Sequence, residues 1–203
     1  MVANTTLRSL CLCVASIVLL SASEGAAEPI AKTEVITGYG FSIDQSVKGD
    51  EGGGFAISGG LLWGVGADWV LGPVVQVAPN VFGGSNTHAG MAIGNAGHGD
   101  RFWQGLLEAG VHHRSGIGQS IFTRSDAKDT DLPYIGATSR LVIDIFEPGG
   151  LRFDLRVSGR RDVGSDKQEA RTESCFLGCT SERTTFESGG WHISGGIGLS
   201  YQL

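Results

Sequence analysis

Two polar residues near the C-terminus have types that could support nucleophilic catalysis. His192 and Ser194 form a His-x-Ser pair, and residues two apart on a strand share a face. A serine nucleophile needs a base within hydrogen-bond reach and an acid that orients the base. Both residues fall on the polar face of their segment, opposite its apolar positions. We therefore interpret the pair as a polar contact, assign no catalytic residue, and expect no enzyme.

The other histidines do not form a metal-binding motif. His112 and His113 are adjacent, so on a strand they point to opposite faces and cannot chelate one metal together. His88 and His98 fall in the Gly- and Asn-rich segment 83–100, which allows a surface metal site but is more typical of an exposed loop. We assign no metal ligand, no cofactor-binding residue and no cofactor.

Two cysteines lie at the middle of a long polar segment, 164–183. Cys175 and Cys179 enclose three residues, and a disulfide at this spacing requires a tight turn. Closing so small a ring stabilises a fold by about 2 kcal/mol in the chain-entropy model. A redox or metal pair is the alternative, but no His or basic residue flanks the pair at ligand spacing. We predict a structural disulfide.

Composition narrows the class of protein. The chain has 203 residues, a formal net charge of −6 and 33 glycines, which is well above the usual glycine share of about 7%. The negative charge argues against a nucleic-acid partner. Glycine is unfavourable inside helices, and here it is spread through apolar segments. These features indicate one glycine-rich β domain and exclude a helical bundle.

The N-terminal segment is typical of a secretory signal. Arg8 precedes the apolar run 10–20, and small residues follow as far as Ala27, which matches a positive n-region, an h-region and a cleavage site. The apolar run is too short for a membrane-spanning helix of about 20 residues. We expect cleavage after Ala27, which gives a signal peptide at 1–27 and a mature domain at 28–203.

The mature chain alternates apolar and polar residues over long segments. In 191–203 the odd-numbered positions are apolar or Gly, whereas the even-numbered positions are polar or small. Such alternation predicts strands with one apolar face. Applied along the chain, it predicts eight strands: 33–44, 54–69, 74–82, 101–113, 117–124, 134–146, 151–163 and 184–203.

The predicted connections alternate in length. Every second connection is tight, and these are 70–73, 114–116 and 147–150. The others are long and polar, and these are 44–53, 83–100, 125–133 and 164–183. An even number of strands with short turns at one end and long loops at the other is typical of a transmembrane β-barrel.

The two faces of these strands differ in charge. The charged face is predicted to line the barrel interior and to form an ion-pair network of Asp68, Glu108, Arg140, Asp144, Arg152, Asp154 and Arg156. The apolar face is predicted to contact lipid through Phe55, Trp63, Trp69, Trp103, Phe153, Trp191 and Tyr201. A secreted soluble β-barrel would have to enclose these aromatics in a narrow interior, so it is the less favoured alternative.

The whole mature chain resembles the small eight-stranded outer-membrane barrel proteins of Gram-negative bacteria, the OmpA membrane-domain and OmpX-like group. Tyr201 matches the inner aromatic position of that family's final strand, which helps the assembly machinery recognise it. The terminal residue here is Leu203, where the family has an aromatic residue. The pair His192 and Ser194 is similar to that of lipid A deacylases, which share this barrel size.

The residues and the resemblance together predict an all-β protein, a closed antiparallel eight-stranded transmembrane β-barrel in the outer membrane of a Gram-negative bacterium. The expected partners are outer-membrane lipid and the barrel-assembly machinery, with no nucleic acid and a monomeric state. The expected function is a structural or surface-interaction role, with a charge-plugged lumen and long extracellular loops. A narrow porin-like channel, a lipid A-modifying enzyme and a secreted soluble barrel are the alternatives.

Overall fold

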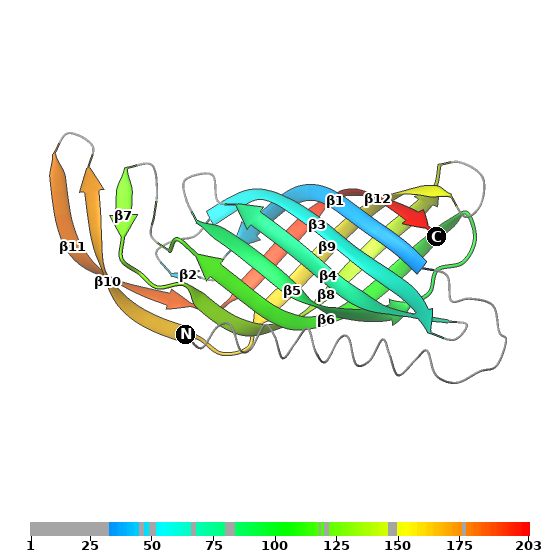
Figure 1. Ribbon diagram of the computed structural model, residues 1–203, viewed down its shortest axis with the longest axis horizontal. Coiled ribbons are helices and arrows are strands. Elements are labelled where there is room, and N and C mark those ends of the chain that lie inside the picture. Colours follow the sequence, from blue (N-terminus) through cyan, green and yellow to red (C-terminus); the bar gives the residue numbers. More distant parts are fainter. Residues whose placement is uncertain are drawn as a thin grey trace. The chain divides into compact units, whose positions relative to one another are not determined.

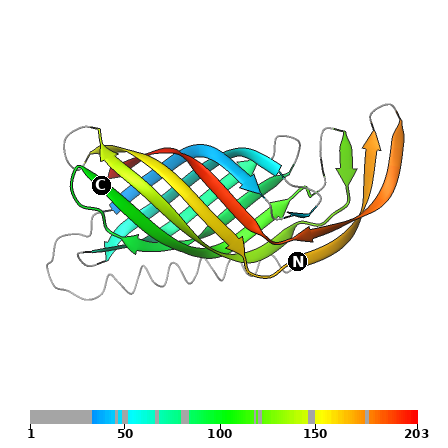
Figure 2. The same cartoon turned by 180° about the vertical axis from the view of Figure 1, so that it is seen from behind.

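The computed structural model describes residues 33–44, 47–48, 52–65, 68–79, 84–117, 119, 122–145, 150–175 and 178–203. Eight long antiparallel strands close into a barrel (Figures 1 and 2). In sequence they are β1 (Thr33–Asp44), β3 (Gly52–Val65), β4 (Trp69–Pro79), β5 (Ser85–Asn95), β6 (Arg101–Ser115), β8 (Thr130–Asp144), β9 (Leu151–Asp162) and β12 (Trp191–Gln202). The predicted fold class, an all-β closed meander of eight strands, is confirmed.

The first and last barrel strands close the wall. β1 pairs with β12 from Glu34 opposite Gln202 to Asp44 opposite His192, and it pairs with β3 on its other side. At every seam of the barrel, even-numbered residues lie opposite even-numbered residues. Because side chains alternate along a strand, the even-numbered side chains of all eight strands face the lumen.

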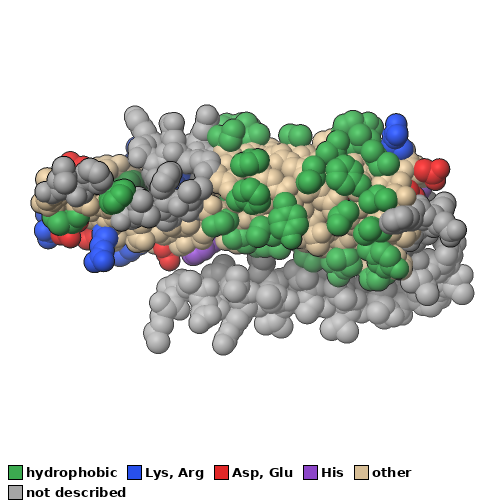
Figure 3. Space-filling view, turned by 90° about the horizontal axis from the view of Figure 1, so that it is seen from above, with side chains coloured by type: hydrophobic (Ala, Val, Ile, Leu, Met, Phe, Trp, Pro, Cys, Tyr) green, Lys and Arg blue, Asp and Glu red, His purple; other side chains and the backbone are tan. Residues whose placement is uncertain are grey.

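The odd-numbered side chains form an apolar outer surface. In Figure 3 hydrophobic side chains gather over the barrel wall, whereas charged side chains show at its ends. Each of the seven predicted lipid-facing aromatics lies on this face. Five are near the strand ends that carry the chain's short turns, and these are Trp63, Trp69, Trp103, Phe153 and Tyr201. Phe55 and Trp191 lie near the opposite end, where Phe55 packs edge-on against Phe41. Two aromatic girdles around an apolar band are typical of a membrane-spanning barrel.

A second, four-stranded sheet follows the order β2-β11-β10-β7. Its strands are β2 (Val47–Lys48), β7 (Thr123–Ser125), β10 (Asp166–Cys175) and β11 (Cys179–Ser188). A small core of Ile117, Ala170 and Phe186 packs with it. The predicted disulfide is confirmed, because Cys175 and Cys179 are bonded and lie opposite each other at the tip of the β10–β11 hairpin. Among the described residues, no helix is long and apolar enough to cross a membrane.

Three predicted assignments were wrong, and the first two errors cancelled in the count of barrel strands. The segment 83–100 was predicted to be a loop, but it contains the barrel strand β5. The predicted strand 117–124 is not one of the barrel strands, since Ile117 belongs to the small core and the described strand 123–125 belongs to the second sheet. The long segment 184–203 is two strands, because Gly189 has a positive φ of 120°, which breaks β11 from β12.

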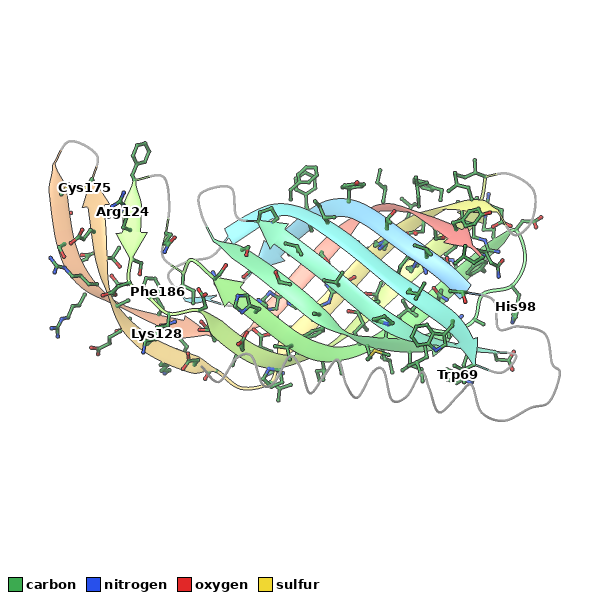
Figure 4. The ribbon with its side chains drawn as sticks, viewed as in Figure 1. Trp69, His98, Arg124, Lys128, Cys175 and Phe186 are labelled. Atoms are coloured by element: carbon green, nitrogen blue, oxygen red, sulfur yellow. A yellow bond between two sulfur atoms is a disulfide. The ribbon has the colours of Figure 1, made fainter. Side chains whose placement is uncertain are left out.

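The predicted connections are corrected accordingly. Residues 70–73 lie inside β4, and 114–116 lie at the end of β6 that leads to the second sheet. The short connections instead are 66–68, 96–100 and 145–150. We call the barrel end that carries them the turn end and the opposite end the loop end. Trp69 and His98 lie at the turn end, whereas Arg124 and Lys128 lie at the loop end (Figure 4). The predicted signal peptide, 1–27, and most of the predicted turn 147–150 lie outside the described residues.

The reassignment of 83–100 can be tested with an arginine scan. Met91 lies on the outer face in the middle part of β5, so Met91→Arg places a charge against lipid. We expect a loss of about 2–4 kcal/mol of unfolding free energy near the bilayer midplane, measured by urea unfolding in lipid vesicles. His98→Arg is the matched control, since that side chain is exposed beyond the end of β5. Equal tolerance of both changes would contradict the assignment of β5 to the wall.

Candidate functional site in the barrel lumen

The centre of the lumen holds a buried arginine, Arg140, that links its own strand to three other strands. Arg140 of β8 donates from Nη2 to Glu34 Oε1 and to Asp154 Oδ2, at 3.1 Å each. Its Nη1 donates to Gln104 Oε1 at 2.6 Å. The Arg140 side chain is 1% exposed and that of Asp154 0%. A buried charge is tolerated only when it is paired and hydrogen-bonded, and these contacts supply such pairing across the barrel.

A second arginine, Arg156, also pairs with the Asp154 carboxylate. Arg156 Nε and Nη2 donate to the two Asp154 oxygens at 2.8 Å each, and Nη1 donates to Ser58 Oγ at 3.0 Å. Gly198 makes this position possible, because a Cβ there would lie 2.2 Å from Arg156 Nη2. A Cβ on Gly38 would lie 2.8 Å from Arg156 Cζ. These inward-facing glycines make room for the guanidinium group, which accounts for part of the high glycine content.

A separate group of contacts lies one layer closer to the loop end. Arg160 of β9 donates from Nε to Glu108 Oε2 at 2.8 Å and from Nη1 to Gln76 Oε1 at 2.7 Å. Thr138 Oγ1 also donates to Glu108. Ser194 Oγ donates to the same Gln76 oxygen at 3.1 Å. The layer therefore joins β4, β6, β8, β9 and β12 through polar side chains.

The turn end of the lumen is part charged and part apolar. Arg152 Nε donates to Asp144 Oδ1 at 2.7 Å, and Arg152 Nη2 donates to Gln202 Oε1 at 3.1 Å. The other side of the interior holds a buried apolar cluster with one residue from each of five strands, β1, β3, β4, β5 and β6. Its residues are Ile36, Leu62, Val70, Ala92 and Leu106. At this end of the lumen, the polar contacts of Arg152 come from β8, β9 and β12, whereas the apolar cluster comes from the other five strands.

Six of the seven residues predicted for the charge network lie in the lumen, and one does not. Asp68 lies in the turn between β3 and β4, where its side chain is 81% exposed and 3.8 Å from His98. The predicted strand 54–69 ran through this turn, which placed Asp68 on the wrong side. Lumen residues that sequence reasoning did not include in the network are Glu34, Gln76, Gln104, Arg160 and Asp162. All five have even numbers and fall inside predicted strands, so the alternation already placed them on the inner face, and only their contacts were not predicted.

A compact cluster of histidines and one aspartate fills the loop-end part of the lumen. We call His88, His112, Asp162 and His192 the histidine–aspartate cluster. They come from β5, β6, β9 and β12, and one donor atom from each lies within 4.8 Å of the other three. His112 Nδ1 is 3.1 Å from Asp162 Oδ1, and His192 Nε2 is 3.0 Å from Asp162 Oδ2. The cluster joins two pairs of neighbouring strands across the lumen.

His88 holds its place in the cluster by ring packing. Its imidazole stacks on that of His112, with ring centroids 4.3 Å apart and an interplanar angle of 4°, and packs edge-on against Tyr134 at 5.1 Å. His88 is 2% exposed, and neither ring nitrogen has a hydrogen-bond partner among the described residues. An unsatisfied buried polar group costs about 1–3 kcal/mol, so this arrangement carries a penalty that packing alone does not remove.

Sequence reasoning did not find this cluster because its members share no motif. His88 was assigned to a loop, and His112 and His192 were each considered with a sequence neighbour. His113 faces outward, as predicted from its adjacency to His112, and lies 2.7 Å from Asp131. His98 lies apart from the cluster at the turn end, so the less favoured alternative of a surface metal site with both His88 and His98 does not form. The sequence did contain one signal for the cluster. Each of its four residues has an even number and lies near the loop end of its strand.

The pair His192 and Ser194, which the sequence analysis interpreted as a polar contact, is divided between two contacts. His192 Nε2 faces Asp162, whereas Ser194 uses its single hydroxyl proton in the bond to Gln76. Both side chains face the lumen and not the outer surface. An acid does orient the imidazole, which the sequence near Ser194 did not indicate. In this arrangement His192 does not activate Ser194, because the hydroxyl of Ser194 donates its proton to Gln76.

The fold and this interior define a class of protein. A closed barrel with an apolar, aromatic-girdled outside and a charged inside is the arrangement of a transmembrane β-barrel. In the outer-membrane protein OprG from Pseudomonas aeruginosa, a similar fold is found with a TM-score of 0.50 and 9% identity, over 86% of this chain and 98% of that chain. This likeness shows that the chain has an outer-membrane barrel fold.

Two further solved structures align at lower TM-scores. The outer-membrane protease OmpT from Escherichia coli aligns over 89% of this chain and 99% of that one, with 6% identity and a TM-score of 0.40. Ail, the attachment invasion locus protein of Yersinia pestis, aligns over 84% and 99%, with 14% identity and a TM-score of 0.37. No protein-family model and no curated protein sequence matches the chain.

The pairing in the central lumen can be tested by a double-mutant cycle. Arg140→Met leaves Glu34 buried without its ion-pair partner, while Asp154 keeps Arg156. We expect a loss of about 3–5 kcal/mol of unfolding free energy, of which Arg140→Met combined with Glu34→Gln recovers a large part. Urea unfolding in lipid vesicles, followed by tryptophan fluorescence, measures both.

The exposed pair Lys167 and Glu187, 3.3 Å apart in the second sheet, provides the control. Lys167→Met is expected to cost less than about 1 kcal/mol, because exposed ion pairs contribute little. A coupling energy below about 0.5 kcal/mol between Arg140 and Glu34 would show that these lumen charges are solvated and independent.

Proposed function

We propose that the protein resides in the outer membrane of a Gram-negative bacterium as a monomeric, non-conducting wall that presents the second sheet outside the cell. The observation that carries this proposal is the buried pairing of Arg140 with Glu34 and Asp154 across the lumen. The interior of an eight-stranded barrel is just wide enough for side chains to fill. A cross-linked set of side chains at its centre leaves no room for a solute path without breaking ion pairs.

The remaining free volume supports a closed lumen. A cavity of about 30 Å³ lies between the central arginines and the Arg160 layer, and a water molecule needs about 10–15 Å³ by this measure. The cavity therefore accommodates about two water molecules and no larger solute. A narrow porin-like channel is the less supported function, since conduction would require Arg140 or Arg160 to move out of the lumen.

The second sheet supports a surface-interaction role. Its hairpin exposes charges of both signs on its two strands, including the pairs Lys167 with Glu187 and Arg171 with Glu173. Polar side chains dominate its exposed positions, so the surface suits a polar ligand. Barrels of this kind have short periplasmic turns and longer extracellular loops, which assigns the loop end to the exterior. The partners we propose inside the envelope are outer-membrane lipid and the barrel-assembly machinery, with no nucleic acid.

Electrical recording tests the closed lumen directly. The refolded protein is expected to give no steady open events in planar lipid bilayers, because the central arginines are paired across the barrel. A variant with both Arg156→Ser and Arg160→Ser removes two of the filling side chains and is expected to give measurable openings. Faster migration of the unheated sample on a denaturing gel shows that each barrel is folded. Steady openings of the unaltered protein would overturn the non-conducting function.

Limited proteolysis tests the orientation. Lys128 lies outside any strand near the loop end and is exposed, while Arg101 is exposed at the turn end. Trypsin added to intact cells is expected to cut at Lys128 or in the hairpin and to leave Arg101 intact. Lysed cells, in which both sides of the membrane are accessible, provide the control. Cleavage of intact cells at Arg101 alone would reverse the orientation.

A further inference from the structure

We propose that the histidine–aspartate cluster binds a divalent transition-metal ion of the class to which Zn²⁺ belongs. The cluster offers three imidazole nitrogens and one carboxylate oxygen, from His88, His112, His192 and Asp162. Zn²⁺ in proteins is held by four such donors in tetrahedral geometry. This proposal replaces the sequence-based expectation of no metal ligand, which rested on histidines considered in pairs along the chain.

The spacing of the donor atoms fits an ion once the side chains turn toward it. Bonds of about 2.0–2.1 Å in a tetrahedral site hold the donor atoms about 3.3 Å apart. The four donors here already lie within 4.8 Å of one another, and Asp162 lies 3.0–3.2 Å from the nearest nitrogens of two histidines. Because the His88 and His112 rings are stacked with an interplanar angle of 4°, one of these two imidazoles has to turn about its side-chain torsions before both ring planes can meet at the ion.

His88 is the residue that distinguishes a metal site from a hydrogen-bonded network. Asp162 accounts for contacts of His112 and His192, so these three residues could be a polar network without an ion. His88 adds a third imidazole to this group, and it is 2% exposed with no hydrogen-bond partner for either nitrogen among the described residues. An ion at the centre of the cluster would accept the lone pair of one His88 nitrogen, which gives this buried side chain a polar partner.

The donor set selects the class of metal. Imidazole nitrogen suits Zn²⁺, Cu²⁺, Ni²⁺ and Fe²⁺, whereas Mg²⁺ and Ca²⁺ prefer sets of oxygen ligands. A neutral histidine coordinates through one nitrogen while its proton resides on the other. The cluster would then carry one carboxylate charge against the two charges of the ion. All four side chains are buried, so the ion would be enclosed when the barrel folds.

The chain has few histidines outside the cluster, so a background variant without them can be made for the test. It contains five histidines, of which His98 and His113 lie outside the cluster. A full-length variant with His98→Ala and His113→Ala, purified without a polyhistidine tag, keeps only the cluster histidines. It is refolded into detergent micelles with ZnCl₂, and free metal is removed by gel filtration. Elemental analysis is expected to find about one Zn²⁺ per chain, and refolding with CoCl₂ is expected to give the intense visible absorption of four-coordinate Co²⁺.

Substitutions within the cluster test each type of ligand. His88→Phe keeps the ring packing against His112 and removes the nitrogens, and Asp162→Asn keeps the shape and removes the charge. Each is expected to weaken Zn²⁺ binding by more than about 100-fold, which exceeds the usual effect of losing an outer-sphere partner. Faster migration of the unheated sample on a denaturing gel confirms that a variant is folded before its metal is measured.

Two results would overturn the proposal. One is a folded background variant that retains no Zn²⁺ and gives only the pale spectrum of hydrated Co²⁺. The other is a folded His88→Phe variant that retains as much Zn²⁺ as the background. If neither substituted variant folds, the Co²⁺ spectrum of the background variant decides, because it requires no change in the cluster.

Discussion

The backbone pairing of β1 with β12 is the constraint from which the rest of the molecule follows. Within hydrocarbon, an open sheet edge would leave N–H and C=O groups without partners, so a membrane-spanning sheet has to close. Closure here runs in continuous register from Glu34 opposite Gln202 to Asp44 opposite His192. It commits one face of every strand to lipid and the other to a narrow lumen. Polar side chains on the inner face then have to find their partners within that lumen.

The interior meets this requirement by linking strands that are distant in sequence. Arg140 of β8 contacts Glu34 of β1, although 106 residues separate them, and Arg160 of β9 contacts Gln76 of β4. Inward-facing glycines such as Gly198 leave the space that the guanidinium groups occupy. The second sheet has no such constraint, because its ion pairs are exposed and contribute little to stability. Charge therefore has a structural role inside the barrel and is available for recognition outside it.

A feature of this fold could be predicted from the sequence when the residues that determine it lie close together in the chain. The predicted strands 33–44 and 151–163 alternate over most of their length, so β1 and β9 and their inner and outer faces were predicted correctly. Arg152 and Asp144 were both predicted to belong to the ion-pair network, and they pair across one short connection, 145–150. β5 was missed because its outward residues Thr87, Ala89 and Met91 are small or only weakly apolar, so the segment has the composition of a loop. Contacts such as Arg140 with Glu34, and the histidine–aspartate cluster, depend on closure between distant strands, which no local pattern encodes.

The position of the histidine–aspartate cluster connects the lumen to the outer sheet. The β10–β11 hairpin is inserted between Asp162, the last residue of β9, and His192, the second residue of β12. The hairpin therefore joins the barrel close to two residues of the cluster, since β10 begins at Asp166 and β11 ends at Ser188. Asp162 N also donates to Gly190 O at 3.0 Å. A metal ion held by these two residues with His88 and His112 would fix the base of the hairpin to the opposite wall. In such a protein, the contacts buried in the lumen would determine the position of the sheet that lies at the loop end of the barrel.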